Sequence, residues 1–139
     1  MKTMNWVPEL ETGVERVDQQ HRELFRRVNM LFDHNQRAEV KETLEFVRDY
    51  VMRHFADEEA LQVASRYPGL QEHKRLHNDF IRIVLELQDR VSQAANEEDQ
   101  EIAVMSVNGM VVDLLTDHVL IQDRRFAEWY KALETKTDL

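Results

Sequence analysis

The sequence predicts an all-α protein, an up-down-up-down four-helix bundle with an irregular N-terminal segment and a short C-terminal helix. Three observations lead to this fold class. Only three Gly and two Pro occur in 139 residues, so few positions interrupt a helix. Apolar residues recur at intervals of three and four in four long segments. The connections between these segments are short, as they are between antiparallel neighbours in a bundle. Residues 1–139 are therefore expected to form one domain.

The first 17 residues lack a helical period and contain two residues that interrupt helices, Pro8 and Gly13. We expect this segment to be irregular, with Trp6 and Val7 packing back onto the bundle.

The first two helices should each bring polar side chains to their apolar faces. The first is expected at 19–35, with Asp18 as N-cap, because a carboxylate there can accept a hydrogen bond from a free backbone N–H. Its apolar face carries His21, Leu24, Phe25, Val28, Leu31 and Phe32. The second is expected at 38–64, and one of its faces carries Leu44, Val47, Val51, His54, Glu58 and Leu61.

Tyr67-Pro68-Gly69 ends the second helix and precedes a third at 70–93. The stripe of the third helix consists of His73, Leu76, His77, Phe80, Val84, Leu87 and Val91. The polar connection Asn96-Glu97-Glu98-Asp99 leads to a fourth helix at 99–120, with Val104, Val107, Val111, Leu114, Leu115 and His118 inward. A last helical piece contains Phe126, Trp129 and Leu133.

Composition restricts the classes of function. The formal net charge of −9 disfavours nucleic acid and anionic membrane surfaces as partners. The absence of Cys excludes disulfides, iron–sulfur clusters and thiolate zinc sites, so a bound metal must use nitrogen and oxygen ligands. No uninterrupted apolar run approaches the ~20 residues that span a bilayer, and the N-terminus lacks the apolar region of a signal peptide. A cytoplasmic monomer is expected.

Histidines and carboxylates gather on the faces that should form the core. Five of the six histidines and two carboxylates take such positions: His21, His54, Glu58, His73, His77, His118 and Asp123. Buried imidazoles and carboxylates need partners, and this number of ligands suits two metal ions better than one.

Spacing alone leaves two of these assignments open. His54 and Glu58 are four residues apart and share a helix face, but Asp57, three residues from His54, fits as well, whereas Glu59 fits less well. Asp123 follows His118 by five residues. It would lie off that face, as a surface carboxylate, unless the helix ends there or widens into a π-type turn. His34 is expected to be exposed at a helix end.

The motifs in order resemble those of hemerythrins. They are Gln20-His21, His54-Phe55-Ala56-Asp57-Glu58-Glu59, Tyr67-Pro68, His73 with His77 and Phe80, and Leu115 with His118 and Asp123, and Trp6 and Gly13 also fit the family's N-terminal segment. The resemblance implies a non-haem di-iron site with an oxo or hydroxo bridge. It implies that His73, His77 and His118 bind one iron, that His21 and His54 bind the other, and that Glu58 and Asp123 bridge them.

The resemblance further implies reversible O2 binding for storage, delivery or sensing, without catalysis. O2 would enter at the open position of the iron bound by His21 and His54, in a dry apolar pocket. Leu115 and Val119 match pocket-lining positions, with Phe25 and Phe55 as neighbours, although the same four side chains fit an ordinary core.

This chain departs from the family's pattern at Leu114, where many members carry Trp, and at Gln62, where many carry Met. The alternatives are a di-iron redox enzyme, such as an oxidase or peroxidase, or a sensor module that acts through a partner. Oxygen-activating bundles use Glu-x-x-His pairs, which this chain lacks at these positions. Gly109 suggests either a close helix approach or a ligand path.

Overall fold

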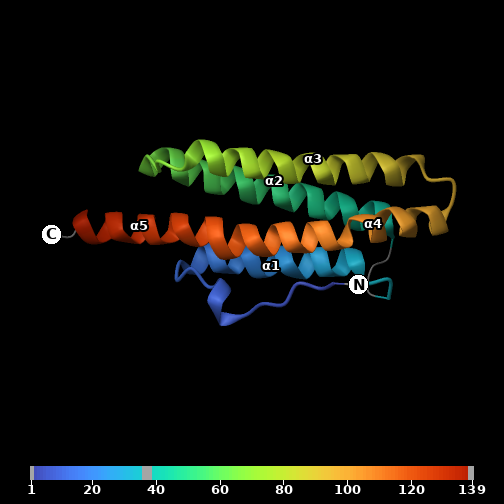
Figure 1. Cartoon of the computed structure of the whole chain (residues 1–139), viewed down its shortest axis with the longest axis horizontal. Helices are drawn as coiled ribbons and strands as arrows, with labels where there is room; N and C mark the ends of the chain where they lie inside the picture. The colour runs from blue at the N-terminus through green and yellow to red at the C-terminus, as the bar shows by residue number, and fades with distance from the viewer. Residues whose placement is uncertain (1, 36–38, 138–139) are drawn as a thin grey trace.

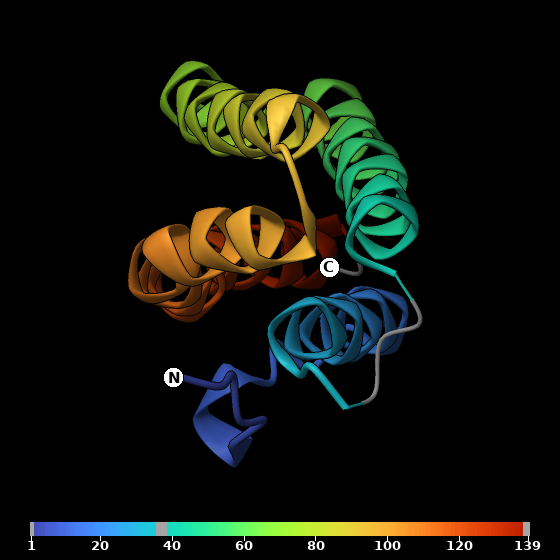
Figure 2. The same ribbon diagram turned by 90° about the vertical axis from the view of Figure 1, so that its right-hand side faces the viewer.

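The computed structural model of this protein describes residues 2–35 and 39–137, with the backbone alone described at 119–120 and 134–137. The elements in order are η1 (Pro8–Leu10), α1 (Glu15–Phe32), α2 (Val40–Ser65), α3 (Leu70–Gln93), α4 (Glu97–Asp117), η2 (His118–Asp123) and α5 (Arg124–Thr137). Successive long helices alternate in direction, and α4 continues through η2 into α5 as one rod (Figure 1). Seen end-on, α1, α2, α3 and this rod form the four corners of a bundle (Figure 2). The predicted fold class is confirmed.

Helix α1 begins four residues earlier than expected, and Val14 rather than Asp18 is its N-cap. Asp18 is buried inside the first turn, where its carboxylate accepts hydrogen bonds from Thr12 N and Oγ1, both at 2.8 Å, and from Gly13 N at 3.1 Å. The N-cap prediction is therefore wrong. Asp18 binds the N–H groups of the preceding loop instead of those of its own helix, and only the path of that loop decides between the two.

The N-terminal segment is held across the bundle by two asparagine amides. Asn29 of α1 accepts from Met4 N at 2.7 Å and donates to Met4 O at 2.6 Å. Asn108 of α4 accepts from Lys2 N at 2.8 Å and donates to Lys2 O at 2.9 Å. Each amide thus satisfies both backbone groups of one residue, as a neighbouring strand would.

Of the two residues expected to pack back onto the bundle, only Trp6 does. Its ring meets Phe25 edge-on, with centroids 5.4 Å apart, whereas Val7 is 40% exposed. The segment before α1 is irregular as predicted, apart from the short turn of η1, which begins at Pro8.

The connection between α2 and α3 follows the prediction closely. Arg66 adopts a left-handed conformation with φ of 60°, and Tyr67 N donates to Gln62 O at 2.9 Å, which closes the last turn of α2. Helix α3 has the bounds that the sequence predicts. The predicted start of α2, at residue 38, lies outside the described residues.

The fourth predicted helix does not end near residue 120. It begins at Glu97, because the Asn96 side chain accepts from Asp99 N at 2.8 Å and caps it. After Asp117 the backbone widens into the π-helical segment η2 and then returns to α-helix in α5. The last helical piece is therefore a continuation of α4.

One stretch of the continuous helix Glu97–Leu133 has a mean hydropathy of 1.4 and is, by length and composition alone, apolar enough to cross a membrane. This value is an average and does not contradict the predicted absence of an uninterrupted apolar run, because polar residues such as Asn108 and Asp113 interrupt the apolar residues of this helix. Of this stretch, 44% is buried inside the bundle. The apolar composition of this stretch is weak evidence for a membrane location, because the core helices of bundles have the same composition.

Candidate metal centre

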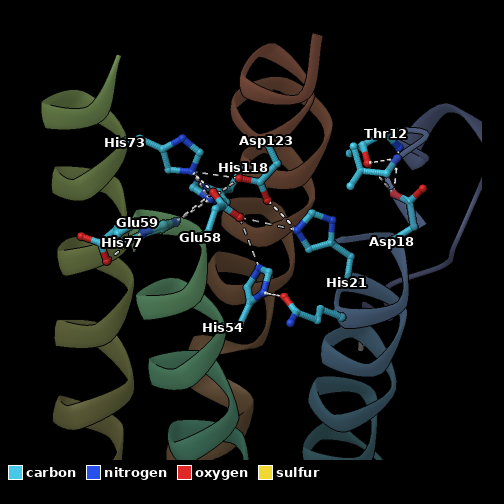
Figure 3. A network of polar contacts seen from close by, with 12 residues as sticks. Thr12, Asp18, His21, His54, Glu58, Glu59, His73, His77, His118 and Asp123 are labelled. Atoms are coloured by element: carbon cyan, nitrogen blue, oxygen red, sulfur yellow. Dashed lines mark hydrogen bonds and ion pairs between the residues drawn. The ribbon is translucent and has the colours of Figure 1, made fainter. Parts of the chain in front are cut away.

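Seven buried histidines and carboxylates meet at one level of the bundle, and every helix of the bundle contributes (Figure 3). None is more than 7% exposed. They are His21 from α1, His54 and Glu58 from α2, His73 and His77 from α3, and His118 and Asp123 from η2. The structure thus brings together all seven residues that the sequence singles out as candidate ligands.

The π-helical segment decides the position of Asp123. A regular helix would turn this residue away from His118, but the widened turn returns it to the same side. Its Oδ1 lies 2.9 Å from His118 Nε2, and the side chain is 1% exposed. Of the two possibilities open from the sequence, the structure shows the widened helix and not the surface carboxylate.

The ligand atoms form two adjoining groups. One contains Glu58, His73, His77, His118 and Asp123, and the other contains His21, His54, Glu58 and Asp123. Within each group the donor atoms all lie within 4.8 Å of one another. The two groups share both carboxylates.

Each shared carboxylate divides its oxygens between the two groups. Glu58 Oε1 lies 2.5 Å from His73 Nε2, whereas Oε2 lies 3.5 Å from His54 Nε2. Asp123 Oδ1 lies 2.9 Å from His73 Nε2, whereas Oδ2 lies 2.8 Å from His21 Nε2. This is the arrangement that a carboxylate needs to bridge two cations.

Several buried atoms of the cluster lack a hydrogen-bond partner within the described part of the chain. They include Nε2 of His54, Oε2 of Glu58 and both carboxylate oxygens of Asp123. In addition, the Nε2 atoms of His73 and His77 each lie 3.2 Å from Nε2 of His118. Three imidazole nitrogens that face one another cannot all donate and accept, and unpaired buried polar atoms are costly. A cation between these nitrogens and oxygens would satisfy them, so the residues present fit bound metal.

The carboxylates and histidines also shift one another's pKa values. Burial alone would lower the pKa of His21, but Asp123 and Glu58 outweigh it and raise that pKa to about 10. In the same way, burial lowers the pKa of His73, but the carboxylates of Asp123 and Glu58, 2.9 Å and 2.5 Å from its Nε2, raise it to about 9. Burial, with the neighbouring His21, lowers the pKa of His54 to about 4.

The pKa values of the two carboxyls move the other way. Burial and the repulsion of Asp123 would raise the pKa of Glu58, but the neighbouring rings of His21, His73 and His77 lower it overall. Burial is likewise outweighed at Asp123, whose pKa the charges of His118 and His21 hold well below its usual value. In the metal-free protein, protonated His21 and His73 therefore supply the positive charge that balances the carboxylates of Glu58 and Asp123.

The second ring nitrogens of three histidines face side chains around the cluster. Nδ1 of His54 lies 2.8 Å from Gln20 Oε1, Nδ1 of His73 lies 3.0 Å from Gln62 Nε2, and Nδ1 of His77 lies 3.4 Å from Glu59 Oε2. Such partners fix the tautomer and orientation of a metal-binding imidazole. Gln20 and Glu59 were not predicted as such partners from the sequence, whereas Gln62 stood out as a departure from the family's pattern beside the ligands. For Gln62, the four-residue spacing from Glu58 was an available signal.

The structure also resolves the competition around Glu58. Glu58 is buried and Asp57 is exposed, so Glu58 is the inward carboxylate. Glu59 lies outside the cluster, with its Oε2 3.4 Å from Nδ1 of His77. His34 is exposed, as predicted, with 76% of its side chain accessible and Nδ1 3.2 Å from Glu101 Oε1.

An apolar cavity of about 110 Å³ adjoins His118. It is lined by Phe55, Leu76, Phe80, Leu114, Leu115, Asp117, His118, Ile121 and Gln122. Two residues predicted for the O2 pocket, Leu115 and Phe55, therefore line it. Phe25 is buried against Trp6 and is not part of its lining, and the side chain of Val119 lies outside the described part of the structure.

A second, more polar groove reaches the other group of ligands. It has a volume of about 360 Å³ and is lined by Arg16, Val17, Gln20, His54, Asp57, Glu58, Ala60 and Leu61. The side of the centre near His54 is therefore approached by charged residues. The expectation of a purely apolar pocket, without acid or base, does not hold on this side.

Leu114 and Gly109 also have defined surroundings. Leu114 lies beside Leu115 in the lining of the apolar cavity. A Cβ added at Gly109 would meet no atom within 4 Å, so a close helix approach does not explain this glycine.

The fold and the cluster together define a class, the helical bundles whose buried histidines and carboxylates can hold cations. The family model described as hemerythrin HHE cation binding domain matches residues 12–130. The chain belongs to the hemerythrin family, as the sequence motifs predict.

Curated relatives match over most of their length. The bacteriohemerythrin of Stenotrophomonas maltophilia is 35% identical over 135 residues, which cover 95% of this chain and 84% of the relative. The bacteriohemerythrin of Pseudomonas aeruginosa is 30% identical over 131 residues, or 92% of this chain and 82% of the relative. The myohemerythrin of Theromyzon tessulatum is 29% identical over 104 residues, or 75% of this chain and 84% of the relative.

Proposed function

We propose that this protein binds O2 reversibly at a non-haem centre of two iron ions joined by an oxo or hydroxo bridge. The observation that carries the proposal is the division of each carboxylate. Glu58 and Asp123 each offer one oxygen to the group around His73 and the other to the group around His21. A site for a single ion would not need two carboxylates placed between two sets of histidines.

The two groups of donors are unequal, and this inequality suits small-ligand binding. His73, His77 and His118 would hold one iron, whereas only His21 and His54 would hold the second. Imidazole and carboxylate ligands suit iron. Iron held by these residues would supply the electrons for reversible O2 binding, and the group of His21 and His54 offers fewer protein ligands for its ion.

The residues of the centre and around it would bind the metal ions, orient the histidine rings and shield the site from water. Glu58 and Asp123 offset part of the positive charge that two ions bring into the core. Gln20 holds the ring of His54 through Nδ1, which leaves Nε2 directed at the centre. Phe55 lies over one face of the His77 ring, with centroids 3.8 Å apart, and with Leu115 it keeps that side of the centre apolar. Restricted access of water and protons would favour reversible binding over further oxidation. The apolar lining supplies this restriction on the His77 side, whereas the groove beside His54 is polar.

The proposal extends to the setting of this function. We infer a cytoplasmic monomer that stores, delivers or senses O2 without catalysing a reaction. The net charge of −9 supports the absence of nucleic acid and anionic membranes among its partners.

Iron content and the visible spectrum test the proposal. The anaerobic protein is loaded with Fe(II), its iron per chain is measured, and its spectrum is followed while air enters and is then removed. Two irons per chain, with a charge-transfer band that appears in air and disappears on deoxygenation, are expected. Direct conversion to a stable oxidised form would refute reversible binding and favour the di-iron redox enzyme.

A pair of variants separates the site from the fold. His77→Leu removes a buried candidate ligand, whereas His34→Leu changes an exposed histidine outside the cluster. Only His77→Leu should lose iron and the reversible band. Equal loss in both variants would contradict the assignment of the site.

A further inference from the structure

The amide of Gln62 is buried between two residues of the metal centre. Gln62 is 0% exposed and lies one turn after Glu58 on α2. Its Nε2 lies 3.0 Å from His73 Nδ1 and 3.4 Å from Glu58 Oε1, while its Oε1 has no partner within the described residues. Burying an amide whose carbonyl oxygen has no partner costs free energy. The presence of Gln62 here is therefore not explained by the stability of the metal-free core.

Metal binding places a definite demand on the proton of His73. The Nε2 of His73 faces both carboxylates, at 2.5 Å from Glu58 and 2.9 Å from Asp123. When Nε2 gives its lone pair to a metal, the proton of the neutral ring must be on Nδ1. Nδ1–H then needs an acceptor, and the Nε2 amide group of Gln62 cannot be one.

A half-turn of the terminal amide of Gln62 supplies that acceptor. The rotation exchanges Oε1 and Nε2, and terminal torsions of this kind have two broad minima of similar energy. Oε1 would then stand where Nε2 now stands, at hydrogen-bond distance from His73 Nδ1. It would also face Glu58 Oε1, and this contact between two oxygens becomes tolerable when Glu58 gives that oxygen to a cation.

The other glutamine beside the cluster already shows this arrangement. Gln20 directs Oε1, not Nε2, at His54 Nδ1 over 2.8 Å, and His54 Nε2 has no hydrogen-bond partner within the described residues. His54 is therefore held ready for a metal, whereas Nδ1 of His73 faces the N–H group of the Gln62 amide and not its oxygen.

We propose that Gln62 is a positioning residue for His73, whose amide turns on metal binding so that Oε1 accepts the Nδ1–H of His73 and leaves Nε2 for the metal. This inference rests on the proposed metal centre and adds a residue to it. It assigns a role to a position at which this chain departs from the pattern of the hemerythrins.

Zinc binding by three variants tests the role of Gln62. Gln62→Met retains length but removes the acceptor, Gln62→Glu retains an acceptor oxygen, and Asn108→Leu removes a different buried amide, outside the cluster. Zn²⁺ affinity is measured by competition with a chelator, and the unfolding of each metal-free variant is measured in urea. Nitrogen-15 NMR of the zinc-loaded protein reports which ring nitrogen of His73 carries the proton.

Gln62→Met should weaken the binding of one Zn²⁺ ion about 10- to 100-fold, the usual effect of losing such a partner. Gln62→Glu should recover most of that loss, and Asn108→Leu should lower stability without a change in zinc affinity. In the wild type, His73 should carry its proton on Nδ1. The proposal is overturned if Gln62→Met binds zinc as the wild type does, if Gln62→Glu does not recover affinity, or if Asn108→Leu weakens zinc equally.

The outcome of the zinc experiment on Gln62 can be told apart from the outcome of the iron and O2 experiment. A wild-type protein with two irons and a reversible O2 band, together with an unaffected Gln62→Met, would refute the role of Gln62 and leave the O2 function standing. Two zinc ions in the wild type without a reversible band in the iron form would refute the O2 function, and the role of Gln62 would be decided by the zinc affinities alone.

Discussion

Phe55 joins the apolar core directly to the metal centre, and its removal should affect both. Its ring is 2% exposed, lies parallel to the His77 ring with an interplanar angle of 7°, and meets Phe80 edge-on at 5.9 Å. Phe→Ala substitutions in cores cost about 3–5 kcal/mol. Aromatic contacts of this kind are worth about 0.5–1.5 kcal/mol beyond burial, so we expect Phe55→Ala to fall near the upper end, at about 4–5 kcal/mol.

The assay for this prediction is urea unfolding of the metal-free protein, followed by circular dichroism and tryptophan fluorescence. The midpoint should fall while the slope with urea stays constant, because the surface exposed on unfolding hardly changes. Phe80→Ala is the matched control. Phe80 is also 2% exposed, but within the described residues its ring meets that of Phe55 and not that of His77.

Both variants should lose comparable stability, but only Phe55→Ala frees the His77 ring. Zn²⁺ affinity should therefore fall in Phe55→Ala and stay near the wild-type value in Phe80→Ala. A loss of less than ~2 kcal/mol in Phe55→Ala would refute the packing argument, because it lies below the range for a buried Phe. Equal zinc affinity in the two variants would refute the coupling between Phe55 and His77.

Three further predictions concern the ligands. His77→Leu should abolish tight binding of one iron while lowering the unfolding free energy of the metal-free protein by at most ~1.5 kcal/mol, because Leu nearly conserves the volume; two retained irons would contradict it. Glu58→Gln should shorten the lifetime of the oxygenated form in the visible spectrum, since the bridge loses its charge, and an unchanged lifetime would count against the bridging role. The pKa values of His21 and His73 are raised from 6.5 to about 10 and about 9, so their protonation stabilises the metal-free fold fully below about pH 6.5. This stability is lost as the pH rises towards 10, as urea unfolding at several pH values would show, whereas the metal-loaded protein should keep its stability because metal replaces the protons. A metal-free protein that is equally stable at pH 6.5 and near pH 10 would contradict the raised pKa values of His21 and His73.

The helices and most of the candidate ligands could be predicted from the sequence because both depend on local spacing. The period of apolar residues gives the bounds of α3, and Tyr67-Pro68-Gly69 marks the turn before it. His73 and His77 lie four apart on that apolar stripe, so their burial follows from the helix itself.

Boundaries set by capping were less predictable. A short carboxylate such as Asp18 can bind the N–H groups of its own helix or those of a preceding loop. Its hydrogen bonds to Thr12 and Gly13 depend on how the N-terminal segment crosses the bundle, and that path is held by Asn29 and Asn108, which are far away in sequence.

The amino-acid sequence by itself determined the all-α bundle, the inward position of most histidines and the hemerythrin motifs, because each of these is written in residue types and short intervals. Helix spacing left Asp123 and the choice between Glu58 and Asp57 open, and the hemerythrin motifs indicated Asp123 and Glu58 without a physical reason. Only the tertiary structure showed that the helix widens at His118–Asp123 and so returns Asp123 to the centre, and that α2 is turned so that Glu58 is buried. It also decided that Gln62 lies against His73. These facts depend on how four helices meet at one level, and the spacing within one helix carries no information about its rotation against the other three.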